Sequence, residues 1–168
     1  MGERTAVRFL SEPASGEAEA CIYIHWGGPP SEMAVVFHDF FERIEKDCSG
    51  MNYRYNDAPS LAARFVAFMA MYAYDKDDGE EVLSLEINGL SVVRDDPRCY
   101  AASGFWMYTV QCTSKAVRRQ TRPSVLYHDV LAVPDESDKS KQSVVWERFI
   151  PLDEAAKNYA RETEEPNE

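Results

Sequence analysis

The amino-acid sequence predicts an α+β fold: a mainly antiparallel sheet, two consecutive amphipathic helices packed on one face of it, and a short C-terminal helix. Apolar and polar residues alternate along several short segments, which is the pattern of strands. Along two longer segments the apolar residues recur at three- and four-residue steps, which is the pattern of helices. These two helical segments follow each other without a strand between them, unlike the alternating elements of a parallel sheet.

Length and composition favour a single domain without a membrane span. The chain has 168 residues, of which 45% are hydrophobic, and a chain of this size typically forms one core. We assign residues 1–163 to one globular domain and expect the acidic tail 164–168 to be disordered. No apolar run approaches the roughly 18 residues of a membrane helix, and the first residues lack a secretory pattern. We therefore expect a cytoplasmic protein.

The first elements are predicted to be a hairpin and a helix. The apolar segments 6–10 and 20–26 are joined by a polar segment that contains Gly16, which is typical of a hairpin connection. Two glycines and two prolines at 27–30 end the second strand, because proline cannot donate to a strand ladder. One apolar stripe then predicts a helix over 31–48. The members of that stripe are Met33, Val36, Phe37, Phe40, Phe41 and Ile44.

A second helix and further strands follow. Two adjacent apolar rows predict a buried helix over 60–75. Asn88-Gly89 stands between two alternating apolar runs and predicts a type I′ hairpin turn. The remaining strands are predicted over 82–87, 90–95, 104–112, 123–133 and 143–150, and the short last helix over 153–162.

Net charge is the most informative bulk property of the sequence. The formal charge is −11 at pH 7, and an acidic excess of this size repels the phosphate backbone of nucleic acids. A basic segment at 113–122 follows several aromatic residues, but net charge and the burial expected for Trp106 or Met107 weigh against direct nucleic-acid binding. The acids predicted to contact a partner are Asp75, Asp77, Asp78, Glu80, Glu81, Asp95 and Asp96.

No motif in the sequence specifies a reaction. Glycine-rich phosphate loops and the G-x-S-x-G motif are absent. His38 and Glu42 share one helix face but lack the two further ligands of a zinc site. The acidic segment 75–86 has its glycine one position early for a calcium loop, and the four cysteines lie far apart without a C-x-x-C pair. We therefore predict buried reduced thiols, no metal and no cofactor.

The strand at 20–26 places Tyr23 and His25 on one face and its isoleucines on the other, because side chains alternate along a strand. Tyr23, His25, Arg54 and Tyr55 are the candidates for a ligand pocket at the turn between this strand and the first helix. The alternative is that His25 has a structural role and forms a hydrogen bond within the turn.

The order of these features resembles a family of small uncharacterised proteins encoded by bacteriophages and other bacterial mobile elements. The resemblance covers residues 20–112. It rests on a Tyr-x-His-Trp-x-Gly-x-Pro turn, on Leu61-Ala62-Ala63 at the start of the second helix and on the aromatic strand FWMYTV. The family turn usually reads His-Trp-Asp-Gly-Tyr-Pro, and here Gly27 replaces the aspartate, so a ligand role of that acid does not carry over. The resemblance implies a bacterial host cell as the setting and no mechanism.

Two functions follow as hypotheses. The first is a non-catalytic acidic protein that inhibits a host or defence protein with a basic surface, as an anti-CRISPR-like or nucleic-acid-mimic antagonist. The second is a small enzyme or ligand-binding domain that uses the pocket at Tyr23 and His25. A homo-oligomeric structural subunit is a further alternative that the sequence leaves open.

Overall fold

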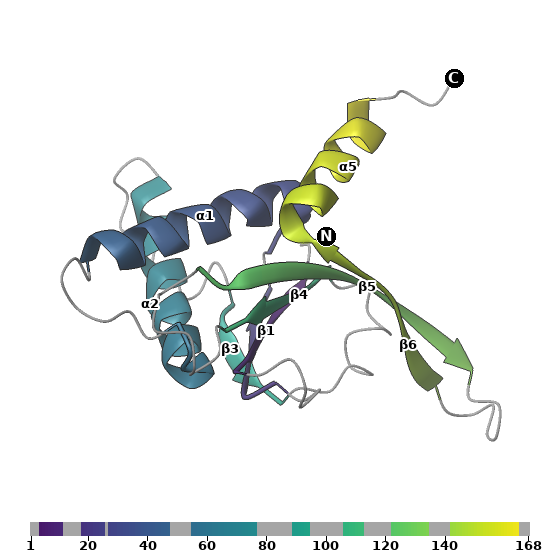
Figure 1. Ribbon diagram of the computed structural model, residues 1–168, viewed down its shortest axis with the longest axis horizontal. Coiled ribbons are helices and arrows are strands. Elements are labelled where there is room, and N and C mark those ends of the chain that lie inside the picture. The colour runs from purple at the N-terminus through teal and green to yellow at the C-terminus, as the bar shows by residue number, and fades with distance from the viewer. Residues whose placement is uncertain are drawn as a thin grey trace.

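The computed structural model confirms the predicted α+β class (Figure 1). Six strands and the helices α1, α2 and α5 lie within the described residues, and none of these helices is long and apolar enough to cross a membrane. The structure describes residues 4–11, 18–25, 27–47, 55–76, 89–94, 106–112, 122–134 and 142–164.

The six strands form one mixed sheet in the order β3-β2-β1-β4-β5-β6. β1 and β4 are parallel neighbours at its middle, and the other neighbouring pairs are antiparallel. The predicted hairpin of β1 and β2 is confirmed. The parallel pair was not predicted, and it is possible because a long connection through α1 and α2 separates the two strands. The strands are β1 (Thr5–Leu10), β2 (Ala20–Ile24), β3 (Ser91–Val93), β4 (Trp106–Gln111), β5 (Ser124–Pro134) and β6 (Gln142–Pro151).

Both long helices begin at residues that satisfy their first backbone N–H groups. Pro29 accepts a hydrogen bond from the amide of Met33 at 3.0 Å, and Pro30 then occupies the first helical position, where its missing N–H costs nothing. Asp57 caps the second helix, because its side chain accepts from the amide of Ser60 at 3.0 Å. The helices are α1 (Pro30–Asp47), α2 (Ala58–Lys76) and α5 (Leu152–Glu164), close to the predicted boundaries.

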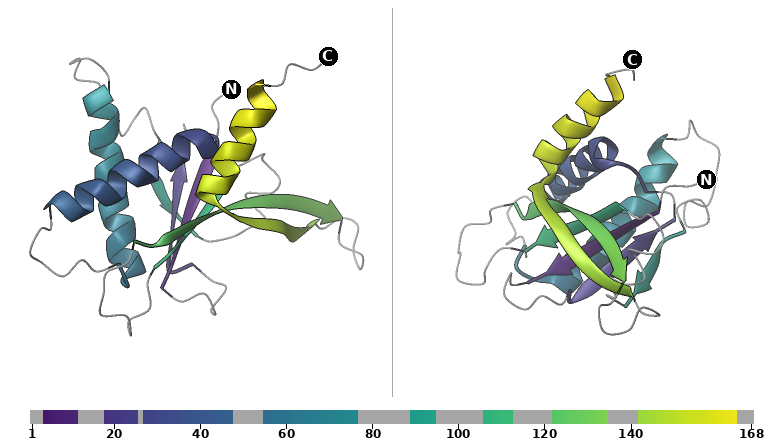
Figure 2. Two further views of the ribbon diagram at one scale, coloured as in Figure 1. Left: turned by 45° about the horizontal axis from the view of Figure 1, so that its top comes forward. Right: turned by 90° about the vertical axis from the view of Figure 1, so that its right-hand side faces the viewer.

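The helices cover one face of the sheet through a cluster of aromatic rings. Phe65 of α2 stacks on Phe37 of α1, with 5.3 Å between the ring centroids, and contacts Phe9 of β1 at 5.7 Å. Phe40 meets the same ring edge-on at 5.2 Å. Tyr108 of β4 extends the cluster to the middle of the sheet by its contact with Phe37. Figure 2 shows α1 and α2 crossing each other, and these rings join them to the strands below.

The opposite face of the sheet is buried at its centre as well. Ala6, Cys21 and Met107 form a small apolar cluster on that side. Arg8 and Thr109, neighbours in the register of β1 and β4, lie on the same face and are also buried. The central strands are therefore enclosed on both faces, which explains why the segment around β4 is apolar almost throughout instead of strictly alternating.

β5 and β6 continue past the other strands as a two-stranded ribbon (Figure 1). β4 pairs with β5 only as far as His128, and a register shift between Asp129 and Val130 marks the point where the ribbon leaves the sheet. A bulge at such a point bends the strand and increases its twist. β6 then returns to the body and runs directly into α5 at Leu152.

Two predicted segments are only partly described. The strand predicted over 82–87 lies outside the described residues, as does Asn88 of its turn. Gly89 is described and has a φ of +52°, the left-handed conformation that a type I′ turn requires. At the C-terminus, α5 extends to Glu164, one residue past the predicted domain boundary, and residues 165–168 lie outside the described part of the chain.

Replacing Phe65 by alanine is expected to lower the free energy of unfolding by about 3–5 kcal/mol, because the change removes a fully buried ring that joins both helices to the sheet. Phe68→Ala, at a partly buried position of the same helix, is the matched control and should cost clearly less. Denaturant unfolding measures both values. Equal losses for the two variants would contradict the central position assigned to Phe65.

Candidate functional site

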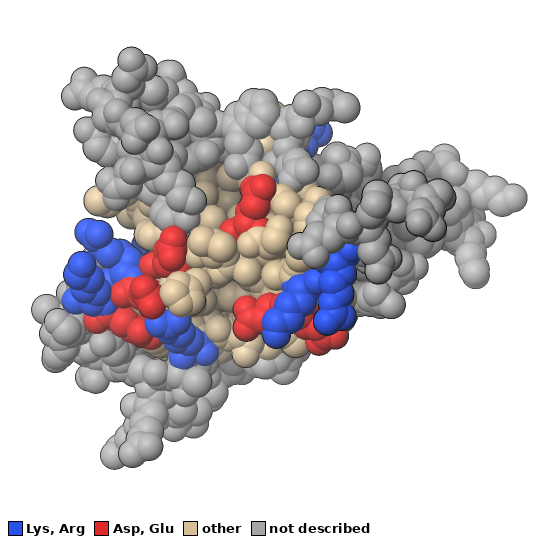
Figure 3. All heavy atoms as spheres, turned by 90° about the horizontal axis from the view of Figure 1, so that it is seen from above, with Lys and Arg blue, Asp and Glu red and all other residues tan. Residues whose placement is uncertain are grey.

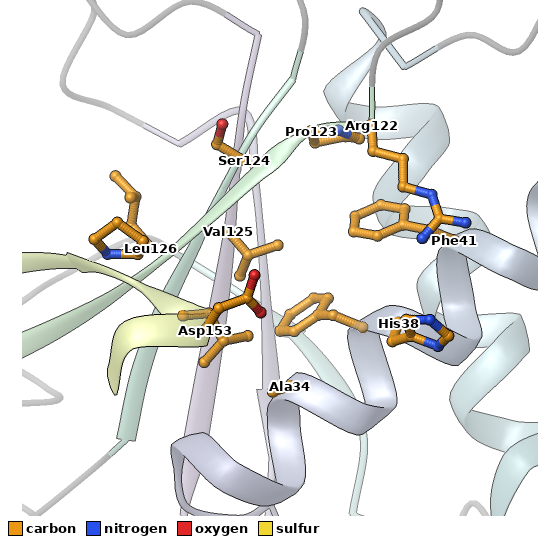
Figure 4. Close-up of a pocket in the computed structure, with 12 residues that line it drawn as sticks. Ala34, His38, Phe41, Arg122, Pro123, Ser124, Val125, Leu126 and Asp153 are labelled. Carbon is orange, nitrogen blue, oxygen red and sulfur yellow. The ribbon is translucent and has the colours of Figure 1, made fainter. Parts of the chain in front are cut away.

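A pocket lies between α1, the start of β5 and the start of α5, and we call it the α1–β5–α5 pocket (Figure 4). Its volume is about 400 Å³, within the range of pockets that bind small ligands or single side chains. Its lining is mainly apolar, with polar groups on the rim. The lining residues are Ala34, Phe37, His38, Phe41, Arg122, Pro123, Ser124, Val125, Leu126, Pro151, Leu152 and Asp153.

The local sequence explains how three distant segments form this pocket. Ala34, Phe37, His38 and Phe41 are spaced by three and four residues, so they share one face of α1. β6 passes into α5 without a loop, and the buried side chain of Leu152 fixes the first turn of α5 to the core. α5 packs against α1, which brings its first turn to the rim of the pocket.

Arg122, which lines the pocket, forms an ion pair with Glu45, a residue 77 positions away in the chain. Arg122 donates from Nε and from a terminal nitrogen to the two carboxylate oxygens of Glu45, each at 2.7 Å. This bidentate hydrogen bonding lowers the pKa of Glu45 and raises the pKa of Arg122. The guanidinium charge is therefore already balanced by Glu45, and Tyr55 adds a longer hydrogen bond to the same carboxylate at 3.4 Å.

The rim of the pocket has an acidic group on the opposite side. Asp153 is exposed in the first turn of α5, and Figure 4 shows its carboxylate directed into the pocket. His38 lies on the facing side with 59% of its side chain exposed, and its Nε2 is 3.5 Å from the carboxylate of Glu42. Among the described residues, no cationic side chain forms a salt bridge with Asp153.

The structure brings together two of the four residues predicted to form a pocket after β2. The hydroxyl of Tyr23 and Nδ1 of His25 share a hydrogen bond of 2.9 Å. Tyr55 lies elsewhere, buried in the core on the helix side of the sheet against Phe41. Arg54 lies outside the described residues.

The turn after β2 is closely packed. A side chain at Gly27 would collide with Thr5, and a Cβ atom at Gly89 would lie 2.6 Å from that of His25. The carbonyl of Gly28 accepts a buried hydrogen bond from the hydroxyl of Tyr108 at 2.9 Å. These contacts support the structural alternative for this turn. The close approach of Thr5 explains the glycine at position 27, and no ligand is needed to account for it.

The acids predicted to contact a partner are largely outside the described structure. Asp75 lies in the last turn of α2, and its side chain is not described. The remaining six fall on residues outside the described ranges. The side chains that the structure describes carry nearly equal numbers of basic and acidic groups, and both signs lie next to each other on the face shown in Figure 3. The excess that produces the net charge of −11 therefore belongs to the other residues.

The cysteine and histidine side chains of the core are poorly suited to catalysis. Burial raises the pKa of Cys112 to about 12, so its thiol stays protonated at neutral pH. Cys21 is a buried thiol. His128 is buried in the sheet with its Nε2 2.5 Å from Oγ1 of Thr109. No three His, Cys, Asp or Glu side chains of the described residues are close enough to form a metal site.

Comparison with models of known protein families, with the sequences of curated proteins and with solved structures finds no match for this chain. The resemblance to phage and mobile-element proteins therefore stays a prediction. The α1–β5–α5 pocket itself was not predicted from the sequence. The sequence showed Arg122 only as part of a basic segment and Asp153 only as the start of a helix. The two residues are far apart in the chain, and no local sequence pattern indicates that they line the same pocket.

Acidification is expected to destabilise the protein through His128. Burial, together with the positive charge of Arg8, lowers the pKa of His128 from 6.5 to about 4. Between these values the unfolded chain binds a proton that the folded protein does not. This contribution to stability is therefore complete above pH 6.5 and is lost as the pH falls towards 4, by about 3 kcal/mol in total. Denaturant unfolding at several pH values measures it.

Two glutamine variants provide the controls. His128→Gln should reduce the pH dependence between pH 7 and 5, whereas His38→Gln, on the exposed face of α1, should preserve it. A free energy of unfolding that stays constant from pH 7 to 5 in the unmodified protein would contradict the low pKa of His128.

Proposed function

We propose that the protein is a non-catalytic acidic binding protein that inhibits a host or defence protein by occupying a basic surface. The observation that carries this proposal is the net charge of −11. A potential of this sign raises the association rate with a basic partner and makes that rate sensitive to salt.

Several features of the described residues support binding in preference to catalysis. The buried thiol of Cys112 is protonated at neutral pH, and His128 is neutral and fixed within the sheet. Tyr23 and His25 are paired with each other in a closely packed turn. The α1–β5–α5 pocket combines an apolar floor with few polar groups, which suits recognition of a partner group.

The test begins with capture of a partner from a bacterial lysate at low salt, followed by kinetics with the purified partner. The partner should have a basic surface, and its association rate constant should fall at least about tenfold between low and high salt. An association rate that does not change with salt would overturn the charge-based mechanism.

Charge variants locate the acids that matter. Neutralising Asp77, Asp78, Glu80 and Glu81 should reduce the association rate by about tenfold at low salt, because these acids form a dense run. The matched control neutralises the same number of acids on the described body, namely Glu19, Glu32, Glu42 and Glu154. We expect the control to change the rate less than about threefold. If the two sets of variants reduce the association rate equally, binding depends on the overall charge and not on the acids at 77–81.

Binding of a small ligand is the second candidate function. The volume of the α1–β5–α5 pocket favours it, whereas the sequence had placed the ligand pocket at Tyr23 and His25. Thermal unfolding in the presence of a set of metabolites tests this alternative. A ligand-dependent rise in melting temperature that Ala34→Trp abolishes in a folded variant would support a small-ligand function at this pocket.

A further inference from the structure

We propose that the α1–β5–α5 pocket binds an arginine side chain of the protein partner, with Asp153 as its counter-ion. This inference rests on the proposed binding function and gives it a specific anchor. The acids outside the described residues would steer the partner, and the pocket would hold one of its cationic side chains.

The charges of the described residues around the pocket favour a cation. The start of α5 contributes a positive potential equivalent to about half an elementary charge. Asp153 and Glu154, both in the first turn, each contribute a full negative charge and outweigh it. Arg122 does not change the balance, because its guanidinium forms two hydrogen bonds of 2.7 Å with Glu45. An incoming carboxylate would therefore meet a negative rim, whereas a guanidinium would meet an acid directed into the pocket (Figure 4).

The floor of the pocket suits the rest of an arginine side chain. The apolar side chain of Val125, which points toward α1, and the facing Ala34 can cover part of its methylene stem. The rings of Phe37 and Phe41 stack on each other with 6.3 Å between centroids and line the same pocket. Because these rings are only 2% and 4% exposed, they supply apolar contact and not a free ring face, and arginine is preferred because its planar group tolerates burial better than the ammonium of lysine does.

Asp153 also has a purely structural explanation. An acid in the first turn of a helix is stabilised by the helix dipole whether or not it binds anything. Glu154 lies in the same turn, carries the same charge and does not line the pocket. Asp153→Asn and Glu154→Gln therefore remove the same charge from the same helix end, and only the first alters the pocket.

The experiment titrates the full-length protein with N-acetylarginine methylamide while backbone amide signals are followed by NMR. The neutral citrulline analogue and the acidic glutamate analogue serve as matched probes. We expect the arginine probe to shift the amide signals of Ala34, His38, Leu126 and Asp153. Its affinity should fall about tenfold in Asp153→Asn and less than about twofold in Glu154→Gln, because a charge pair at contact distance in partly exposed surroundings is worth roughly this ratio.

Several outcomes would overturn the inference. It fails if the citrulline or glutamate probe binds as well as the arginine probe, or if both variants weaken binding equally. Butylguanidinium, a free small cation, distinguishes a small-molecule ligand from an arginine of a protein. If it binds more tightly than N-acetylarginine methylamide, the pocket binds a small molecule and the inference is overturned. Captured partner that binds Asp153→Asn with unchanged affinity would exclude the pocket as the anchor and leave the proposed acidic binding function intact.

Discussion

The ring of Phe65 is the point on which the rest of the structure depends. It touches Phe37 and Phe40 of α1 and Phe9 of β1, so one side chain fixes the position of two helices over the sheet. Tyr108 extends this cluster in another direction, because its ring contacts Phe37 while its hydroxyl holds the carbonyl of Gly28. The turn after β2, the start of α1 and the middle of the sheet are thereby linked through contacts that are all buried.

The pocket is a consequence of that core. Phe37 belongs to both, since one side of its ring stacks on Phe65 and it also lines the pocket. Leu152 plays a similar part for α5, because its burial in the same core holds the first turn of α5 beside α1. The rim groups Asp153 and His38 are therefore carried by rigid elements, and their separation is fixed by packing. A site built in this way can hold a side chain without reorganising first.

Charge acts at short range within the structure and at long range on a partner. The described side chains are close to electrical balance, and a bidentate ion pair joins Arg122, which lines the pocket, to Glu45. The acidic excess belongs to other residues, and a charge of this sign would attract a partner with a basic surface. Long-range attraction by such acids and short-range anchoring by the pocket would act at successive stages of one association.

The sequence by itself determined the approximate positions of the described helices and strands, the end of β2 before the prolines and the acidic character of the chain. Those features depend on residues within a few positions of one another, so periodicity and turn residues reveal them. The tertiary structure alone decided that β1 and β4 are parallel neighbours, that Arg122 pairs with Glu45 and that Asp153 faces α1. These contacts join segments far apart in the chain, and only the packing of aromatic side chains selects them among the many pairings that local patterns allow.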